Sequence, residues 1–385
     1  MEERPAIQIR PCEDSNVPQL MTFIDRHWRQ GHILSHDRAL LDWQFAPSRG
    51  KSMGFPGPTV LLAWNGQAIV GILGLIPFQL NLSGRVSPAA WLSLWLVIPE
   101  ARRSTAGLDL LRKAQEMGFK AIFGVGMNDT VKRVYSTLGF EVMDEVPRWV
   151  GVLDRTATES LLADVFPASE TGSIQQLCRD YSSDSNVVPG GDSEIEIQTQ
   201  TESFGQDFDS FWSETVEPAM SGPAKDSSYL NWRYLEHPTW SYDLLTAKDR
   251  RSGELLGLCV SRLETIKDRS ESILRIVEFM AADNAQPALA AAVVAAGRKQ
   301  GAVLADFYCT SAKAARGLES AGFRQARASQ LDLGFPTRFQ PVDMESFSLT
   351  GAFWLAPELR SESGPLLDIE NFYITKSDGD QDRPN

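Results

Sequence analysis

The fold is decided by two adjacent stretches, WLSLWLVIPEARRSTAGLDLLRKAQEMG (residues 91–118) and AIFGVGMNDTVKRVYSTLGF (residues 121–140). The first begins with an apolar run, Trp91 to Leu96, which predicts a buried strand. A polar turn follows, and then a helix with several leucines in its early turns. In the second stretch another apolar strand leads through Asn128 to a helix that is followed by a Gly-Phe pair. The sequence therefore predicts a strand–helix–strand–helix unit.

The turn after the first strand has the composition of an anion-binding site. A strand-to-helix turn directs several backbone N–H groups and the positive end of the helix dipole toward one point. Two arginine side chains would add positive charge there, which suits a pyrophosphate. The alternative is an ordinary turn with two surface arginines. The turn consists of Arg102, Arg103, Ser104, Thr105, Ala106 and Gly107.

The residue order across both stretches resembles the acetyl-CoA-binding half of the GNAT acyltransferases. The pattern is V-x-P-x-x-R-x-x-x-x-G-x-x-L-L, then N, then Y-x-x-x-G-F. Arg102 matches the first residue of the family's coenzyme turn, and Gly107 matches its second glycine. Thr105 stands where that turn usually has its first glycine. The resemblance implies that acetyl-CoA, or another acyl-CoA, is the cosubstrate, with no metal.

The resemblance also implies how the coenzyme would be held. Residues 102–107 would bind its diphosphate. The preceding strand would pair with the pantetheine arm as a neighbouring strand does, and one of its backbone N–H groups would polarise the thioester carbonyl. The strand residues concerned are Trp95, Leu96 and Val97.

The groups that would transfer protons are only partly identifiable. Tyr135 would donate a proton to the departing thiolate, or it packs on the inner face of its helix. Asn128 would hydrogen-bond the pantetheine arm, cap its helix, or do both. The strand from Trp91 to Val97 lacks a carboxylate or histidine, although many relatives carry a general base there. The remaining candidates are a water chain, Glu141, Asp144, Asp42, His32 and His36.

The composition argues against several classes of partner. The formal charge is −13, from 37 basic and 50 acidic residues, and such a surface repels nucleic acids and anionic membranes. No apolar run approaches the roughly 18 residues of a membrane span, and no secretory signal is evident. We therefore expect a cytoplasmic protein; the sequence does not predict its oligomeric state. Its cysteines have neither disulfide nor metal spacing and should be reduced: Cys12, Cys178, Cys259 and Cys309.

The same pattern starts again in the second half of the chain. LDWQF (residues 41–45) is matched by LNWRY (residues 230–234), and STLGF (residues 136–140) by ESAGF (residues 319–323). An apolar hairpin follows the first member of each match, so the blocks keep their order, as expected of a duplication. We predict an α+β (mixed α/β) fold with two tandem GNAT-like domains. Each domain would be a central mixed, mostly antiparallel twisted sheet flanked by helices.

The second copy lacks the residues that the resemblance assigns to the coenzyme. Counted from the shared Gly-Phe pair, Ser311 replaces the asparagine and Leu318 replaces the tyrosine. The coenzyme turn falls on residues 285–290, which contain neither Arg nor Gly, and Pro287 removes one N–H. We therefore expect this copy to be a degenerate domain that acts as a scaffold.

The expected boundaries follow shifts in composition. Residues 1–155 would form the acyl-CoA-binding domain and residues 195–345 the degenerate domain. Residues 156–194, rich in Ser, Asp and Gly, would be a linker with one short helix. Residues 346–385 would add edge strands or a covering segment and a polar tail, for which disorder is the default expectation. A weaker alternative is that the tail contacts a polar substrate through Asp378, Asp380 and Asp382.

Three functions are compatible with this pattern. The first is a CoA-dependent N-acyltransferase, most simply an N-acetyltransferase, that acts on a small amine in the N-terminal copy. The second is an aminoacyl transferase resembling the peptidoglycan-bridge (FemABX-like) enzymes, and the third a non-catalytic acyl-CoA sensor. The tandem layout is also similar to double-GNAT proteins found with polysaccharide genes, which suggests an amino sugar as one acceptor.

Overall fold

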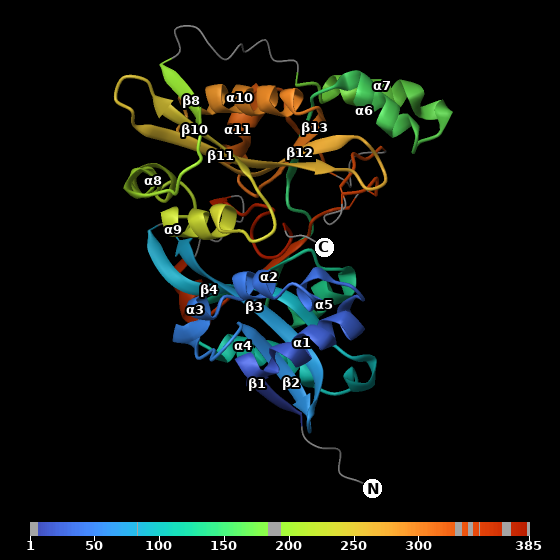
Figure 1. The fold of residues 1–385 in the computed structure, drawn as a ribbon, viewed down its shortest axis with the longest axis vertical. Coiled ribbons are helices and arrows are strands. Elements are labelled where there is room, and N and C mark those ends of the chain that lie inside the picture. Colours follow the sequence, from blue (N-terminus) through green and yellow to red (C-terminus); the bar gives the residue numbers. More distant parts are fainter. Residues whose placement is uncertain are drawn as a thin grey trace.

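The computed structural model describes residues 7–82, 84–183, 194–327, 333–337, 342–345, 347–363 and 371–382. These residues form two halves stacked end to end, each built on a twisted sheet with helices packed against it (Figure 1). The sheets are mixed and mostly antiparallel, so the predicted fold class is confirmed.

The first sheet has the strand order β1-β2-β3-β4-β5-β15-β6. Its neighbours are antiparallel except β4 and β5, which run parallel. The short β9 (Gly222–Pro223) pairs with β3 off this path. The bounds are β1 Gln8–Pro11, β2 Val60–Asn65, β3 Ala68–Leu82, β4 Arg85–Val97, β5 Ala121–Val125, β6 Glu141–Met143 and β15 Gly351–Leu355.

Helices cover both faces of this sheet because its strands are apolar on both sides. One core joins the sheet to α1 (Val17–Phe23) and α2 (Arg38–Gln44), and the other joins it to α4 (Ala106–Glu116) and α5 (Asp129–Thr137). A fully buried side chain of the size of leucine or phenylalanine contributes about 1.5–3 kcal/mol. The short α3 (Pro47–Gly50) follows α2 and lies at the edge of the first half.

The second sheet has the order β14-β7-β13-β12-β11-β10-β8, and only β12 and β13 are parallel. Its strands are β7 Arg148–Val152, β8 Ile195–Thr199, β10 Asp243–Asp249, β11 Leu255–Thr265, β12 Ser272–Ala281, β13 Ala302–Tyr308 and β14 Arg324–Gln325. Its main core includes residues of α8 Gln206–Phe211, α9 Ser227–Leu230, α10 Gln286–Lys299 and α11 Ala312–Ser320.

The two halves exchange one strand each. β7 follows β6 in the chain but pairs with β13 and β14 of the second sheet. β15 follows β14 but lies between β5 and β6 of the first sheet. Both occupy the same place in the strand order, so the exchange is reciprocal. β7 thus joins the second sheet although it falls within residues 1–155, and β15 is an interior strand, not the edge strand expected.

The expected linker contains more structure than its composition indicates. Two helices, α6 (Arg155–Ala163) and α7 (Thr171–Asp180), fall within residues 155–180. They pack on the second sheet through Leu161, Leu162, Ile174 and Cys178 (Figure 1). The prediction of a single short helix was wrong. The segment has few apolar residues, but those it has lie on the faces of α6 and α7 that pack against the sheet. Residues 184–193 lie outside the described part of the chain.

The matched motifs of the two halves meet at their boundary. Trp43 Nε1 donates to the carbonyl of Trp232 at 2.9 Å, and Trp232 Nε1 donates to the carbonyl of Trp43 at 3.2 Å. The two rings stack with centroids 5.0 Å apart. The two hydrogen bonds are reciprocal, like the contacts across the two-fold axis of a homodimer. This geometry agrees with a duplication in which the two tryptophans are equivalent.

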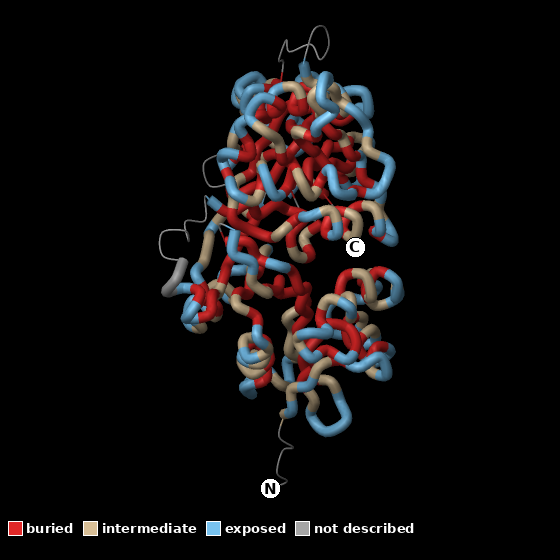
Figure 2. Tube along the Cα trace, turned by 90° about the vertical axis from the view of Figure 1, so that its left-hand side faces the viewer, coloured by how far each residue is buried: buried red, intermediate tan, exposed pale blue. Residues whose placement is uncertain are grey.

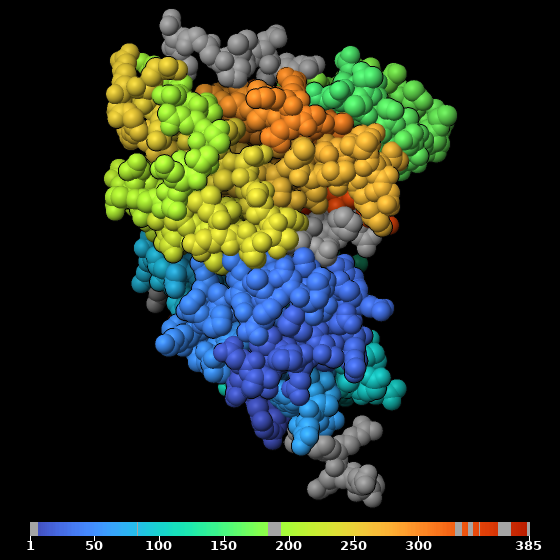
Figure 3. Space-filling model, viewed as in Figure 1, coloured from blue at the N-terminus to red at the C-terminus, as the bar shows by residue number. Residues whose placement is uncertain are grey.

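The last described segment, residues 371–382, passes between the halves. Most of its side chains are buried, and it contributes to the buried layer where the halves meet (Figure 2). The default expectation of disorder for the polar tail, residues 377–385, was therefore wrong for residues 377–382, while residues 383–385 lie outside the described part of the chain. On the face that Figure 3 shows, the residues around α9 lie directly on the first half. All four cysteines are free thiols, and all four are buried.

Candidate active site

The parallel strands β4 and β5 diverge after a short common ladder. They pair only from Ala89 to Trp91 of β4 with residues 121–123 of β5. Beyond Trp91, β4 continues to Val97 and pairs on its other side with β3. One edge of this part of β4 thus faces a gap, where an extended ligand could pair with it. Trp95, Leu96 and Val97 all lie on this part of the strand.

A bulge in β4 accompanies the divergence. The register with β3 shifts between Ile72 and Gly74, opposite residues 93–96. Leu94, at the bulge, has a φ of 50°, which a leucine rarely adopts, and its side chain is buried. Such backbone strain, of order 1–3 kcal/mol, is found most often at functional sites. A bulge also bends its strand, which accounts for the departure of β4 from β5.

The gap between β4 and β5 opens into a cavity of ≈ 290 Å³. Both strands contribute to its walls, together with the start of α5 and the C-terminal segment. The residues relevant here are Trp28, Ser93, Trp95, Asn128, Tyr135, Asp380 and Gln381. The cavity therefore brings together three of the predicted site residues: Tyr135 of α5, its N-cap Asn128, and Trp95 of β4.

Tyr135 is buried between two aromatic rings and lines the cavity. Its ring stacks on Trp95 (5.4 Å between centroids) and on Phe140 (4.6 Å). Burial, with a smaller contribution from the charge of Asp380, raises the pKa of the Tyr135 phenol above its ordinary value. The hydroxyl has no hydrogen-bond partner among the described residues. Tyr135 is thus both a packed aromatic and a protonated group at the cavity, so the two alternatives coexist.

Asn128 is the N-cap of α5. Its side-chain oxygen accepts a hydrogen bond from the backbone N–H of Val131 at 3.0 Å. The residue is exposed and also lines the cavity, and its amide N–H₂ group is not needed for the cap. The cap is therefore present, and it leaves a donor for a ligand.

The predicted anion-binding turn lies at the end of β4. Residues 102–105 are exposed, and α4 begins at Ala106, so the first-turn N–H groups of α4 have no acceptor within the helix. Arg102 Nε donates to the carbonyl of Val97 at 3.2 Å, which holds this guanidinium beside the strand. The Thr105 hydroxyl donates to Asp109 on the first turn of α4 at 2.5 Å. A Cβ on Gly107 would meet only ordinary contacts with Val97 and Trp95.

Asp380 is a site residue that sequence reasoning did not assign to proton transfer. Its carboxylate accepts hydrogen bonds from Ser93 Oγ on β4 at 2.5 Å and from Gln381 Nε2 at 2.9 Å. Gln381 also donates to the carbonyl of Val125 on β5 at 3.3 Å. A buried carboxylate thus reaches the cavity from a segment 287 residues away from Ser93 in the chain.

The five side chains considered as general bases lie elsewhere, and none lines this cavity. Glu141, Asp144 and Asp42 form ion pairs with Arg360, Lys132 and Arg38. His32 caps a short helical turn, accepting from the N–H of Leu34, and His36 is exposed. The carboxylate at the cavity is Asp380, for which the only sequence signal was an acidic tail.

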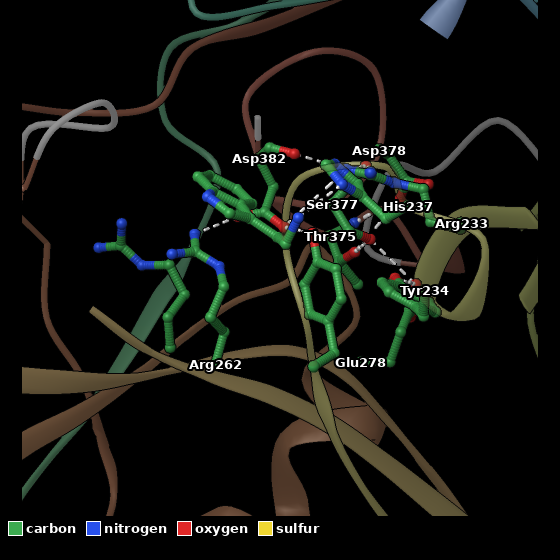
Figure 4. A network of polar contacts seen from close by, with 12 residues as sticks. Arg233, Tyr234, His237, Arg262, Glu278, Thr375, Ser377, Asp378 and Asp382 are labelled. Atoms are coloured by element: carbon green, nitrogen blue, oxygen red, sulfur yellow. Dashed lines mark hydrogen bonds and ion pairs between the residues drawn. The ribbon is translucent and has the colours of Figure 1, made fainter. Parts of the chain in front are cut away.

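Buried ion pairs hold the C-terminal segment on both sides of Asp380 (Figure 4). Asp378 Oδ2 lies 3.1 Å from Lys225 Nζ, which also contacts Glu278 at 2.7 Å. Asp382 Oδ1 accepts from Arg262 Nη2 at 2.7 Å. Of the three tail aspartates, only Asp380 faces the cavity, so the expectation that all three contact a substrate was wrong. The other two position the segment.

The corresponding place in the second half keeps only a smaller cavity of ≈ 200 Å³, between the end of β12, Gln286 and the start of α11. β12 and β13 pair up to Ile276 and Phe307, and beyond that point the buried Tyr373 accepts a hydrogen bond from the N–H of Phe279 at 2.9 Å. Gln286, at the first turn of α10, is buried and donates to Ala281 and Asp283. In the described part of the second half, a side chain thus occupies the N–H of Phe279, and the helix start at Gln286 is buried rather than exposed as at residues 102–105.

Comparisons with known proteins agree with this geometry. Residues 8–143 match the model of the acetyltransferase (GNAT) domain. Residues 8–143 are therefore similar to a GNAT domain, and the second sheet repeats the strand order of the first. No curated protein matches the chain.

Solved structures with this fold span most of the chain. A GCN5-related N-acetyltransferase from Kribbella flavida is 15% identical, with a TM-score of 0.54, over 91% of this chain and 71% of that one. One from Anabaena variabilis is 12% identical, with a TM-score of 0.53, over 90% and 72%. Saccharomyces cerevisiae N-myristoyltransferase with bound myristoyl-CoA is 10% identical, with a TM-score of 0.51, over 92% and 85%. At these identities the likeness shows the fold.

Within the described ranges, no cluster of His, Cys, Asp or Glu has the arrangement of a metal site. No helix in the same ranges is both long and apolar enough to cross a membrane.

Proposed function

We propose that the protein is an N-acyltransferase that transfers an acyl group, most simply acetyl, from CoA to a small amine. The observation that carries this proposal is the open gap between β4 and β5, where Tyr135 and Asp380 face one cavity. Residues 102–107 would bind the diphosphate at the start of α4. Trp95, Leu96 and Val97 would pair with the pantetheine arm, and Asn128 would donate to it.

The proposed reaction is a direct attack with no covalent enzyme intermediate. Asp380, directly or through a water molecule, accepts one proton from the ammonium form of the acceptor and so frees the amine. The amine nitrogen then forms a bond to the thioester carbon, and a backbone N–H of the bulged β4 stabilises the oxyanion. As the carbon–sulfur bond breaks, Tyr135 donates its proton to the thiolate, and the nitrogen releases its remaining extra proton to water to give the amide. Proton exchange with solvent restores both side chains.

If the coenzyme binds only in the first half, substitutions at the corresponding turns of the two halves should affect its binding differently. Arg102→Ala removes a guanidinium beside the diphosphate site, and we expect it to weaken acetyl-CoA binding by about 10-fold, the loss of one charge-assisted hydrogen bond. Gln286→Ala changes the corresponding turn of the second half and should leave binding unchanged. Calorimetric titration with acetyl-CoA measures both. Equal losses at the two positions would contradict a single site in the first half.

The substitution Asp380→Asn tests the proposed role of Asp380 as the general base. We expect kcat/KM to fall by about 10²-fold or more at neutral pH, because the amide cannot accept the proton. The loss should shrink as the pH rises toward the pKa of the acceptor amine, since the free amine needs no base. Asp144→Asn, an exposed carboxylate outside the cavity, is the matched control. A loss that is the same at every pH would show that Asp380 only supports the structure.

A further inference from the structure

The cavity between β4 and β5 is lined from both faces of the first sheet. Tyr135 and Trp95 pack in the core that α4 and α5 form on one face. Ser93 instead accepts a hydrogen bond from Gln44 of α2, at 3.4 Å, on the other face. Trp28 reaches the cavity from this second face too, at the end of the helical turn Ile24–Trp28 that continues α1. Since the proposed diphosphate site lies at the start of α4, the side of Trp28 is left for the acceptor.

Trp28 presents an aromatic surface to this cavity. Its side chain is 39% exposed, although most large apolar side chains of the protein are buried. Among the described residues no other aromatic ring stacks on its indole, and its Nε1–H has no hydrogen-bond partner. Trp95, on the other wall, already stacks on Tyr135. Aromatic rings pack favourably on one another in offset or edge-to-face arrangements. Trp28 is therefore available to a flat apolar group of a ligand.

The charge of the cavity selects against acidic ligands. Of the described residues that line it, only Asp380 carries a formal charge at neutral pH. The exposed Arg26 and Arg29, close to Trp28 in the chain, are not among the lining residues. A carboxylate or phosphate on the acceptor would thus lie near Asp380 without a basic partner, and such an approach of like charges is costly. An ammonium group would instead be attracted to this carboxylate.

The polar side chains of the cavity are largely engaged already. The Ser93 hydroxyl and the Gln381 amide both donate to Asp380. Gln381 also donates to the carbonyl of Val125, and Asn128 caps α5 and is assigned to the pantetheine arm. A hydroxylated acceptor would leave some of its own polar groups without partners, and each of them costs free energy. The volume of ≈ 290 Å³ is at the lower end for ligand sites. The cavity thus favours a small, apolar amine.

We propose that the acceptor is a primary amine with an aromatic ring and no acidic group, an arylalkylamine, whose ring lies against Trp28 while its nitrogen faces Asp380. The inference rests on the proposed N-acyltransferase function and adds the substrate class. The transfer itself is the reaction given above. An amino sugar would bring several hydroxyl groups to a wall that offers an aromatic face.

The first test compares acceptors with the unaltered protein and acetyl-CoA. We expect kcat/KM for phenethylamine to exceed that for ethylamine, which lacks the ring, by about 10-fold or more. Glucosamine should be poorer than phenethylamine by a similar factor of about 10. Phenylalaninamide should exceed phenylalanine by about 10²-fold, because the two have the same size and only phenylalanine has a carboxylate. Initial rates of CoA release measure all five acceptors.

The second test alters the aromatic surface. Trp28→Ala should raise KM for phenethylamine by about 10-fold and leave KM for ethylamine and the affinity for acetyl-CoA unchanged. Trp28→Phe keeps a ring and should be intermediate. Phe347→Ala, which removes an exposed aromatic side chain outside the cavity, is the matched control. Because Trp28 is exposed, its loss should change the free energy of unfolding little, which denaturant titration checks.

The third test needs no acyl transfer. Calorimetry measures the binding of phenethylamine to the unaltered protein, both alone and saturated with CoA, which carries no acyl group to transfer. We expect phenethylamine and phenylalaninamide to bind, and phenylalanine to bind about 10²-fold more weakly than its amide. Trp28→Ala should weaken the binding of phenethylamine by about 10-fold.

The possible outcomes separate this inference from the proposed function. Turnover of phenylalanine equal to that of its amide, a preference for ethylamine or glucosamine, or equal effects of Trp28→Ala and Phe347→Ala would overturn the substrate class and leave the acyltransferase proposal intact. A failure of phenethylamine to bind or to react would overturn it as well. Binding of phenethylamine that depends on Trp28, in a protein that binds neither CoA nor acetyl-CoA, would support the amine site and reject the proposed function.

Discussion

Tyr135→Phe is expected to lower kcat by about 10²–10⁴-fold, the usual contribution of a general acid. The phenylalanine ring can keep the stack with Trp95 and Phe140, so only the hydroxyl is lost. The affinity for acetyl-CoA should stay the same, because the hydroxyl would act on the leaving thiolate and not on the bound coenzyme. Steady-state kinetics together with calorimetry separates these two quantities.

The pKa of Tyr135 adds a second readout. Since burial raises this pKa, the phenol stays protonated well above neutral pH. The pH–rate profile of the unaltered protein should therefore show no alkaline loss of activity from this group below pH about 10. Tyr181→Phe, which removes a hydroxyl bonded to the carbonyl of Gln325 far from the cavity, is the control. An unchanged kcat in Tyr135→Phe would show that Tyr135 contributes only to packing and does not donate a proton.

The second large effect concerns stability and the exchanged strand β7. Asp306 on β13 is fully buried between Arg148 of β7, at 2.7 Å, and Arg275 of β12, at 3.0 Å. Asp306→Ala leaves both guanidinium groups without this carboxylate. We expect the free energy of unfolding to fall by about 3–5 kcal/mol, as when one partner of a buried ion pair is removed.

Denaturant titration measures this loss against a matched exposed pair. Asp164→Ala removes the partner of Arg269, an ion pair at 2.8 Å in which the aspartate is largely exposed. It should change the free energy of unfolding by about 1 kcal/mol or less. Similar, small losses for both variants would show that the buried ion pairs do not stabilise the contact between β7 and the second sheet.

The same carboxylate makes stability depend on pH. Burial opposes the ionisation of Asp306, but Arg275 and Arg148 outweigh it and hold its pKa below the ordinary value. A group with a lower pKa in the folded state stabilises the fold above its unfolded pKa, about 3.9 for an aspartate. That contribution is lost as the pH falls below about 4. Asp306→Ala should lack this part of the acid destabilisation.

The sequence predicted the class of fold correctly, and it also predicted the part of the proposed site that is local in the chain. The strand, the turn at residues 102–107, the cap at Asn128 and the helix with Tyr135 lie within some forty residues, where periodicity and turn chemistry act directly. The repeated motifs, such as those of Trp43 and Trp232, were also visible in the sequence and predicted a duplication. These features depend on short-range patterns.

The strand exchange could not be predicted in the same way. An alternating run such as residues 148–152 predicts a strand, but its pattern does not state which sheet it joins. The choice between two similar sheets depends on partners far away in the chain. Arg148 on β7, for example, finds Asp306 158 residues later.

The acidic tail was misjudged for a related reason. Composition alone treats Asp378, Asp380 and Asp382 as solvated charges, since isolated polar segments rarely bury enough apolar surface to fold. In the structure, Asp378 and Asp382 are paired with Lys225 and Arg262, which are more than a hundred residues away. Asp380, which lies between these two anchors, is thereby placed at the cavity of the candidate active site.

The most direct test of the central claim is a crystal structure of the protein with acetyl-CoA bound. The account predicts that the diphosphate lies against residues 102–107 and that the pantetheine arm lies between β4 and β5. The thioester would then be beside Tyr135, on the side of the cavity that Asp380 faces. A coenzyme bound near residues 285–290, or a gap between β4 and β5 that stays empty at saturating acetyl-CoA, would contradict it.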